Sequence, residues 1–193
     1  MEPAFTRLTP LVEALGEVVA GYGDLPYAFF GHSLGGLVAF ELGRHLRRLG
    51  RPEPVFLFAS GCRAPQLPHR DGPVYNLPEP DFRDKLRELG GTPEEVLNHA
   101  ELMSVIGPVI RADYEIYDTY SFAPGPPLGC PLSVFGGSED SEVTPEDLEA
   151  WREHTHGDFR IRTLPGHHLF INQARELLLK SMAIDLREAG LIR

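Results

Sequence analysis

Ser33 lies in the pattern Gly31-His32-Ser33-Leu34-Gly35, and this spacing predicts a nucleophile. A serine presented on a turn too tight for side chains needs glycine two residues before it and two residues after it. Its hydroxyl is a poor nucleophile at neutral pH, so a base must take the proton and an acid must orient the base. The pattern therefore predicts acyl transfer through a serine, assisted by a histidine and a carboxylate from elsewhere in the chain.

The residues on either side of Ser33 indicate how the turn is built. The apolar run 27–30 precedes the pattern as a strand would, and an apolar stripe with helical spacing follows it from Leu34 to Leu49. Strand, sharp turn and helix are the order that a nucleophile elbow requires. A free backbone N–H at the start of such a helix can stabilise a developing oxyanion by a hydrogen bond. We expect the N–H of Leu34 to be this donor.

The remaining chain predicts an α/β fold. Residues 55–59 and 131–135 are short apolar runs typical of buried parallel strands, and 159–164 alternates as an edge strand would. A final helix is expected from about Leu169 to Ala189. Between the second and third strands the alternation stops, and helical patterns separated by prolines and glycines take its place. The predicted organisation is a hydrolase core made of residues 1–64 and 131–193, with a helical lid inserted at 65–130.

The base and the acid are sought at the ends of the strands. In α/β hydrolases the order along the chain is serine, then Asp or Glu, then histidine, each in a loop after a strand. Of the eight histidines, only His167 and His168 directly follow the last strand. The strand at 131–135 is followed by Glu139 and Asp140, and the residues alone leave both acids and both histidines open, with Asp140 the stronger candidate acid.

Composition excludes several classes of function. The chain has 193 residues, 42% of them hydrophobic, which suits one soluble globular protein. Its formal net charge of −10 argues against a nucleic-acid partner. No apolar run is long enough to span a membrane, and two cysteines read as reduced thiols of a cytoplasmic protein. We expect the basic residues at the end of the helix after Ser33 to stabilise the negative partial charge of its C-terminus rather than form a docking patch. These residues are Arg44, His45, Arg47, Arg48 and Arg51.

Several motifs together resemble the type II (editing) thioesterases that accompany nonribosomal peptide and polyketide synthases. They are Gly31–Gly36, Gly137-x-x-Asp140-x-x-Val143-Thr144, Pro165–Phe170, Gly90–Pro93, Glu101–Met103 and Arg111–Tyr114. The resemblance implies an α/β-hydrolase fold, mostly parallel and three-layered, and a triad of Ser33, Asp140 and His168. The family usually has glycine where His167 stands, so an exchange of roles between the two histidines stays open.

The resemblance also implies the substrate. The expected reaction is hydrolysis of acyl thioesters on the phosphopantetheine arm of acyl or peptidyl carrier proteins, with no metal and no cofactor of the enzyme's own. A general esterase acting on a free small ester, and an inactive remnant, are the alternatives. Chains of this family are longer at the N-terminus, where they have additional strands and a loop that donates a second oxyanion-hole N–H. We expect those strands to be missing from this sequence.

Overall fold

The computed structural model describes residues 3–22, 25–70 and 72–193. The chain forms two compact units, one made of Met1–Leu11 with Pro68–Phe122 and the other of Val12–Leu67 with Ala123–Arg193. In chain order the elements are α1 (Leu8–Ala20), β1 (Ala28–His32), α2 (Leu34–Arg48), β2 (Phe56–Ser60), α3 (Glu79–Leu89), α4 (Glu94–Leu97), α5 (Ala100–Asp118), β3 (Leu132–Gly137), α6 (Pro145–Glu149), η1 (Ala150–His154), β4 (Phe159–Leu164), α7 (Phe170–Gln173) and α8 (Arg175–Glu188).

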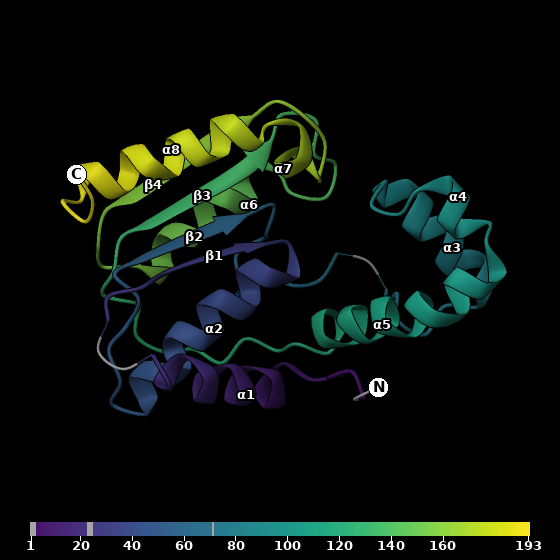
Figure 1. Ribbon diagram of the computed structural model, residues 1–193, viewed down its shortest axis with the longest axis horizontal. Coiled ribbons are helices and arrows are strands. Elements are labelled where there is room, and N and C mark those ends of the chain that lie inside the picture. Colours follow the sequence, from purple (N-terminus) through teal and green to yellow (C-terminus); the bar gives the residue numbers. More distant parts are fainter. Residues whose placement is uncertain (1–2, 23–24, 71) are drawn as a thin grey trace. The chain divides into compact units, whose positions relative to one another are not determined.

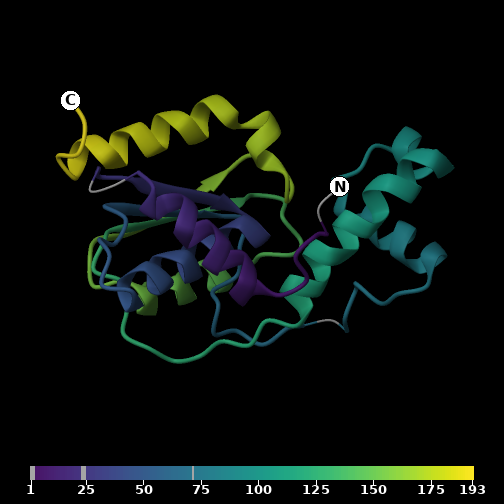
Figure 2. The same ribbon diagram turned by 60° about the horizontal axis from the view of Figure 1, so that its bottom comes forward.

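The larger unit is built on a parallel sheet with the strand order β1-β2-β3-β4. Its strands are in register, so that Ala59 of β2 lies beside Gly31 of β1 and beside Val134 of β3. Helix α8 runs along one face of this sheet and α2 along the other (Figures 1 and 2). The predicted α/β-hydrolase fold, parallel with helices on both faces, is confirmed. The carboxyl ends of all four strands therefore meet at one edge, where loops can converge.

Apolar side chains on the α8 face form a continuous core. Aromatic rings from β2 and β3 meet Leu164 of β4 and the helices that follow; the cluster contains Phe56, Phe58, Phe135, Leu164, Phe170, Ala174 and Leu178. The final helix differs from the prediction, since it is broken into α7 and α8 at Ala174. Phe170, Ala174 and Leu178 keep a spacing of four residues through the break and stay buried, so the apolar pattern does not reveal it.

The basic residues at the end of α2 act inside the unit. Arg44 pairs with Glu41 at 2.5 Å and donates to the carbonyl of Ala123 at 2.6 Å. Arg47 donates to the carbonyls of Pro126 and Pro127, so both guanidinium groups hold the segment that leads back into β3. Two of the five basic residues therefore make contacts within this unit.

The smaller unit is helical and has a core of its own. Its buried residues come from α3, α4, α5 and the segment before them: Val74, Phe82, Leu86, Leu97 and Met103. Arg111 of α5 stacks its guanidinium 3.9 Å from the centre of the Phe82 ring and donates to the carbonyls of Tyr75 and Leu77. Asp118 accepts the N–H groups of Val74 and Tyr75. These polar contacts fix the irregular segment before α3 against α5.

No helix within the described ranges combines the length and the apolar character that crossing a membrane requires. The same ranges contain no group of three or more His, Cys, Asp and Glu side chains arranged to hold a metal ion.

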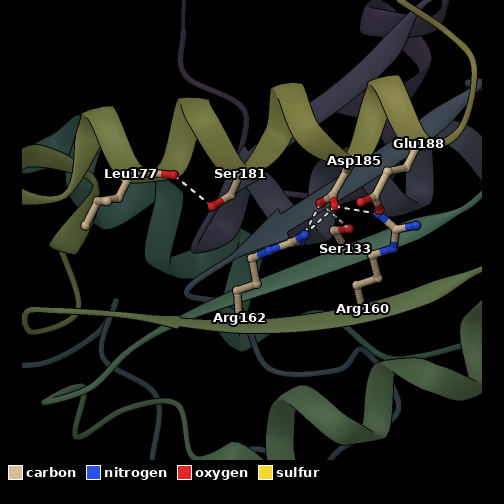
Figure 3. A network of polar contacts seen from close by, with 7 residues as sticks. All are labelled: Ser133, Arg160, Arg162, Leu177, Ser181, Asp185 and Glu188. Atoms are coloured by element: carbon tan, nitrogen blue, oxygen red, sulfur yellow. Dashed lines mark hydrogen bonds and ion pairs between the residues drawn. The ribbon is translucent and has the colours of Figure 1, made fainter.

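A buried carboxylate joins α8 to the sheet (Figure 3). The side chain of Asp185 is 0% exposed and accepts hydrogen bonds from Arg162, from Arg160 at 2.7 Å and from the Ser133 hydroxyl at 2.8 Å. Burial by itself would raise the pKa of Asp185, but the hydrogen bonds from Arg162, Arg160 and Ser133 outweigh it and lower the pKa below its ordinary value. The carboxylate is therefore charged in the folded protein at neutral pH.

We expect Asp185→Asn to lower the free energy of unfolding at pH 7 by about 3 kcal/mol, because two arginines lose a buried counter-charge. The folded-state pKa lies below the unfolded value of about 3.9, so this contribution is complete above that pH and disappears as the pH falls below it. Urea denaturation at pH 7 and at decreasing pH measures the difference. Glu188→Gln, at a side chain 56% exposed, is the control and should cost less than about 1 kcal/mol. If the difference in the free energy of unfolding between the wild type and Asp185→Asn stayed constant down to pH 3, packing and not charge would explain the loss of stability.

Candidate active site

Ser33 occupies the turn between β1 and α2 in a strained conformation. Its φ of 53° is the only positive value at a non-glycine residue among the described residues. Such a conformation costs about 1–3 kcal/mol and persists only where surrounding contacts enforce it. Here the N–H of Ser33 donates to the carbonyl of Ser60 at 2.8 Å, and the Ser33 carbonyl accepts from Gly36 at 2.9 Å. The predicted elbow is present and is anchored to the end of β2.

The glycines of the elbow are not equivalent. A Cβ on Gly31 would lie 1.9 Å from the carbonyl oxygen of Gly35, so no other residue fits there. A Cβ on Gly36 would lie 2.9 Å from Cβ of Cys62, which makes Gly36 the second close approach. At Gly35, by contrast, a Cβ meets nothing within 4 Å. The sequence-based argument that both flanking glycines avoid collisions is therefore right for Gly31 and wrong for Gly35.

His168 lies between Ser33 and Asp140. Its Nε2 is 3.0 Å from Oγ of Ser33, and its Nδ1 is 3.0 Å from Oδ2 of Asp140. Because a carboxylate can only accept, Nδ1 carries the proton and Nε2 is left to accept from the serine hydroxyl. This is the tautomer that a general base for Ser33 requires.

The loop that carries His168 passes closely over the end of β3. A Cβ on Gly137 would lie 2.4 Å from the carbonyl oxygen of Gly166 and 2.6 Å from that of His167. Gly166 itself has φ of 124°, a value that other residues rarely adopt. These two glycines bring the last loop of the sheet to the residues that follow β3.

The Asp140 carboxylate is 0% exposed and is held by its own loop. Oδ1 accepts the N–H groups of Glu142 at 2.9 Å and Val143 at 3.2 Å, which leaves Oδ2 for His168. Burial opposes the charge, but the hydrogen bond and charge of His168 and the two backbone donors lower the pKa of Asp140 below its ordinary value. Asp140 is therefore ionised at neutral pH and faces His168.

The alternative acid and base pair with each other instead. Nε2 of His167 is 3.3 Å from Oε2 of Glu139, and the two side chains are 74% and 60% exposed. Nδ1 of His167 lies 3.1 Å from the backbone carbonyl of Glu139. The structure thus brings Ser33, Asp140 and His168 together, while His167 and Glu139 form a surface pair beside them.

The N–H of Leu34 belongs to the first residue of α2. The first N–H groups of a helix have no carbonyl partner within it and carry its partial positive charge. Leu34 directly follows Ser33, so its N–H is the donor that the sequence predicts for an oxyanion formed at the serine.

Sequence reasoning missed the part that the end of β2 plays. Ser60 is fully buried; its carbonyl anchors Ser33, and its hydroxyl lies 3.0 Å from Nδ1 of His32. The centres of the His32 and His168 rings lie 5.3 Å apart. A Cβ on Gly61 would lie 2.6 Å from Cε1 of His32. Burial, followed by the neighbouring His168, lowers the pKa of His32 to about 4. His32 is therefore neutral and packs beside His168. The only signal for this in the sequence is that Ser60 and Gly61 end a strand at the same sheet edge.

Comparison with known proteins gives consistent matches over almost the whole chain. A family model described as "Thioesterase domain" matches residues 1–183. The gramicidin S biosynthesis protein GrsT of Aneurinibacillus migulanus is 40% identical over 186 residues, which are 96% of this chain and 73% of GrsT.

Solved structures agree with these sequence matches. RedJ, a thioesterase from the prodiginine biosynthetic pathway of Streptomyces coelicolor, is 38% identical with a TM-score of 0.90, over 96% of this chain and 74% of RedJ. BorB, a type II thioesterase from the borrelidin biosynthetic cluster, is 35% identical with a TM-score of 0.86, over 96% of this chain and 75% of BorB. The resemblance to type II thioesterases inferred from the motifs is confirmed.

The unequal glycines of the elbow give a prediction. Gly31→Ala should lower the free energy of unfolding by about 3 kcal/mol or more, because its methyl group would overlap the α2 backbone. Gly35→Ala should leave stability unchanged or raise it by up to about 1 kcal/mol, since alanine favours the helix and meets open space. Urea denaturation of the two variants measures the contrast. Equal losses at both positions would contradict the open space at Gly35.

Proposed function

This chain belongs to the thioesterase family, and from that premise we propose that Ser33, His168 and Asp140 hydrolyse acyl thioesters on the phosphopantetheine arm of carrier proteins. The proposal rests above all on His168, whose two ring nitrogens lie 3.0 Å from the Ser33 hydroxyl and 3.0 Å from the Asp140 carboxylate. The relatives named above, from gramicidin S, prodiginine and borrelidin biosynthesis, support a role beside a peptide or polyketide synthase.

The geometry supports a two-step reaction. Oγ of Ser33 attacks the thioester carbonyl while Nε2 of His168 takes the hydroxyl proton, and Asp140 stabilises the imidazolium that forms. The N–H of Leu34 donates to the tetrahedral oxyanion. The C–S bond then breaks, and His168 returns the proton to the pantetheine thiolate. In the second step His168 takes a proton from water, the hydroxide attacks the acyl-serine ester, and the carboxylic acid leaves as Ser33 regains its proton.

The chemistry of the substrate suits this site. A thioester carbonyl has less resonance stabilisation than an ester or an amide, so a triad hydrolyses it without a highly tuned oxyanion hole. The pantetheine arrives covalently attached to its carrier protein, and the reaction requires no metal and no further cofactor. We therefore propose acyl or peptidyl carrier proteins as the partners, in the cytoplasm where synthases load them.

The helical unit is proposed to be the lid, as the sequence predicts for residues 65–130. Five apolar residues of α5, Met103, Val105, Ile106, Val109 and Ile110, differ in their exposure. Met103 is 3% exposed and belongs to the unit's own core, with Ile106 and Ile110 packed against it. Val105 and Val109 are 55% and 47% exposed, and their spacing of four residues places them on one face of α5. We propose Val105 and Val109, rather than all five residues, as contacts for variable acyl groups.

Asp140→Asn should lower the turnover number for a butyryl-loaded carrier protein by roughly 10³- to 10⁴-fold, because the amide favours the wrong tautomer of His168. Glu139→Gln, in the exposed pair next to it, should change turnover by less than about twofold. Steady-state kinetics with purified variants measure both. The assignment of the acid would be wrong if Glu139→Gln had the larger effect.

Recognition of the carrier protein is tested by changing only what bears the acyl group. Butyryl-phosphopantetheinyl carrier protein should be hydrolysed with a higher kcat/KM than butyryl pantetheine, and both reactions should disappear in Ser33→Ala. A change of one or two methylenes should alter kcat/KM little, because each is worth about 1–3 kcal/mol only in a tight pocket. Equal values with and without the carrier would remove the partner from the proposal. A strong preference for p-nitrophenyl butyrate would indicate a general esterase instead.

A further inference from the structure

The loop that follows β2 is bonded at several points to the segment that follows the Asp140 loop. Nε1 of Trp151 donates to the carbonyl of Cys62 at 2.8 Å, and the Gln66 amide donates to the carbonyl of Ala150 at 2.9 Å. Trp151 is 0% exposed, so the first of these bonds is sealed from water. The two segments therefore form one packed layer beside the site, although the loop after β2 contributes no residue to the triad.

An ion pair inside this layer has no role in the reaction described above. Nε of Arg63 lies 3.2 Å from Oδ1 of Asp147, and the two side chains are only 12% and 4% exposed. Surface ion pairs contribute little to stability, but a buried carboxylate depends strongly on its cation. Arg63 is thus a major determinant of where Asp147 and the start of α6 come to rest.

Asp147 in turn fixes the end of the catalytic-acid loop. Its Oδ2 accepts the N–H of Thr144 at 2.9 Å, while the Thr144 hydroxyl accepts the N–H of Asp147 at 3.3 Å, so the two form a capping box. The preceding N–H groups, those of Val143 and Glu142, donate to Asp140. Three successive backbone N–H groups are therefore oriented by two carboxylates, one of which is held by Arg63.

We propose that Arg63 is a positioning residue for the catalytic acid, acting through Asp147 and the 140–144 loop. The inference rests on the proposed function of Ser33, His168 and Asp140. Without the guanidinium group, the Asp147 carboxylate gains by turning toward water, and the turn that it caps moves with it. The Asp140–His168 contact of 3.0 Å then lengthens. A misplacement of about 1 Å in an active site can cost up to about 10²-fold in rate, although Arg63 itself touches neither substrate nor base.

The test uses Arg63→Gln and Arg63→Lys in the full chain. It has two readouts: kcat and KM with a butyryl-loaded carrier protein, and the rate at which a fluorophosphonate labels Ser33. Arg63→Gln should lower kcat and the labelling rate by roughly 10- to 100-fold, with KM changed by less than about twofold, because the acid acts on the base and not on substrate binding. Arg63→Lys retains the charge and should recover part of the loss. If Arg63→Gln does not fold, Arg63→Lys carries the same comparison with a smaller effect.

A control variant separates positioning from general destabilisation. Arg44 and Glu41 form an ion pair of similar burial, 7% and 12% exposed, within the same unit. Arg44→Gln should lower the free energy of unfolding as Arg63→Gln does, but it should leave kcat and the labelling rate within about twofold of the wild type. An equal loss of activity in Arg44→Gln would show that any broken buried pair has this effect, and would overturn the inference.

A double-mutant cycle with Asp140→Asn identifies the route. If Arg63 acts through the acid, Arg63→Gln should slow labelling by less than about twofold once Asp140 is Asn, while its effect on stability persists. The inference would be overturned if Arg63→Gln lowered the labelling rate by the same factor in the wild-type and Asp140→Asn backgrounds, or lowered it in neither. Labelling also separates this inference from the proposed function: a wild type that is labelled rapidly but does not hydrolyse the acyl carrier protein contradicts only the proposed function. A wild type that is not labelled contradicts both.

Discussion

The contact between the backbone of Gly31 and the first turn of α2 is the constraint from which the site follows. The strand and the helix can come this close only because Gly31 has no side chain, since a Cβ there would be 1.9 Å from the Gly35 oxygen. Their approach forces the residue between them into a positive φ, and that residue is Ser33. The strain is offset by the hydrogen bond to Ser60, so the position of Ser33 is fixed by β1, α2 and β2 together. Serine is thereby presented beyond the sheet edge with a helix N-terminus directly behind it.

The parallel register of the sheet brings the other groups to this point. Ser33 and His168 are 135 residues apart in the chain, and Asp140 and His168 are 28 residues apart, but they follow the carboxyl ends of β1, β3 and β4. In a parallel sheet those ends share one edge, so loops from distant parts of the sequence meet there. Close approach again depends on glycine, because Gly137 lets the loop with His168 lie directly on the end of β3. The same physical device therefore places both Ser33 and His168.

The sequence predicts the parts of this arrangement that depend on short-range patterns. The apolar runs that form the strands, the elbow and the position of Asp140 after β3 can be read from neighbouring residues. The choice between His167 and His168 cannot, because both lie in one loop and only its backbone conformation decides which ring turns toward Ser33. The open space at Gly35 and the Arg63–Asp147 pair also escape such reasoning, since they depend on contacts between residues far apart in the chain. The break at Ala174 is hidden because burial keeps the same spacing on both sides of it.

The buried carboxylates of the larger unit show that Asp140 is held differently from Asp147 and Asp185. Asp147 and Asp185 face arginines, which are cations at all times, and both serve to fix the structure. Asp140 faces His168, which gains a positive charge in the proposed reaction, and two backbone N–H groups also stabilise the carboxylate. In that proposal the attraction to His168 is greatest in the transition state, which is the condition for accelerating the reaction and not merely binding the substrate. The low pKa of His32 supports this proposal, because a second positive charge beside His168 would oppose the formation of the imidazolium.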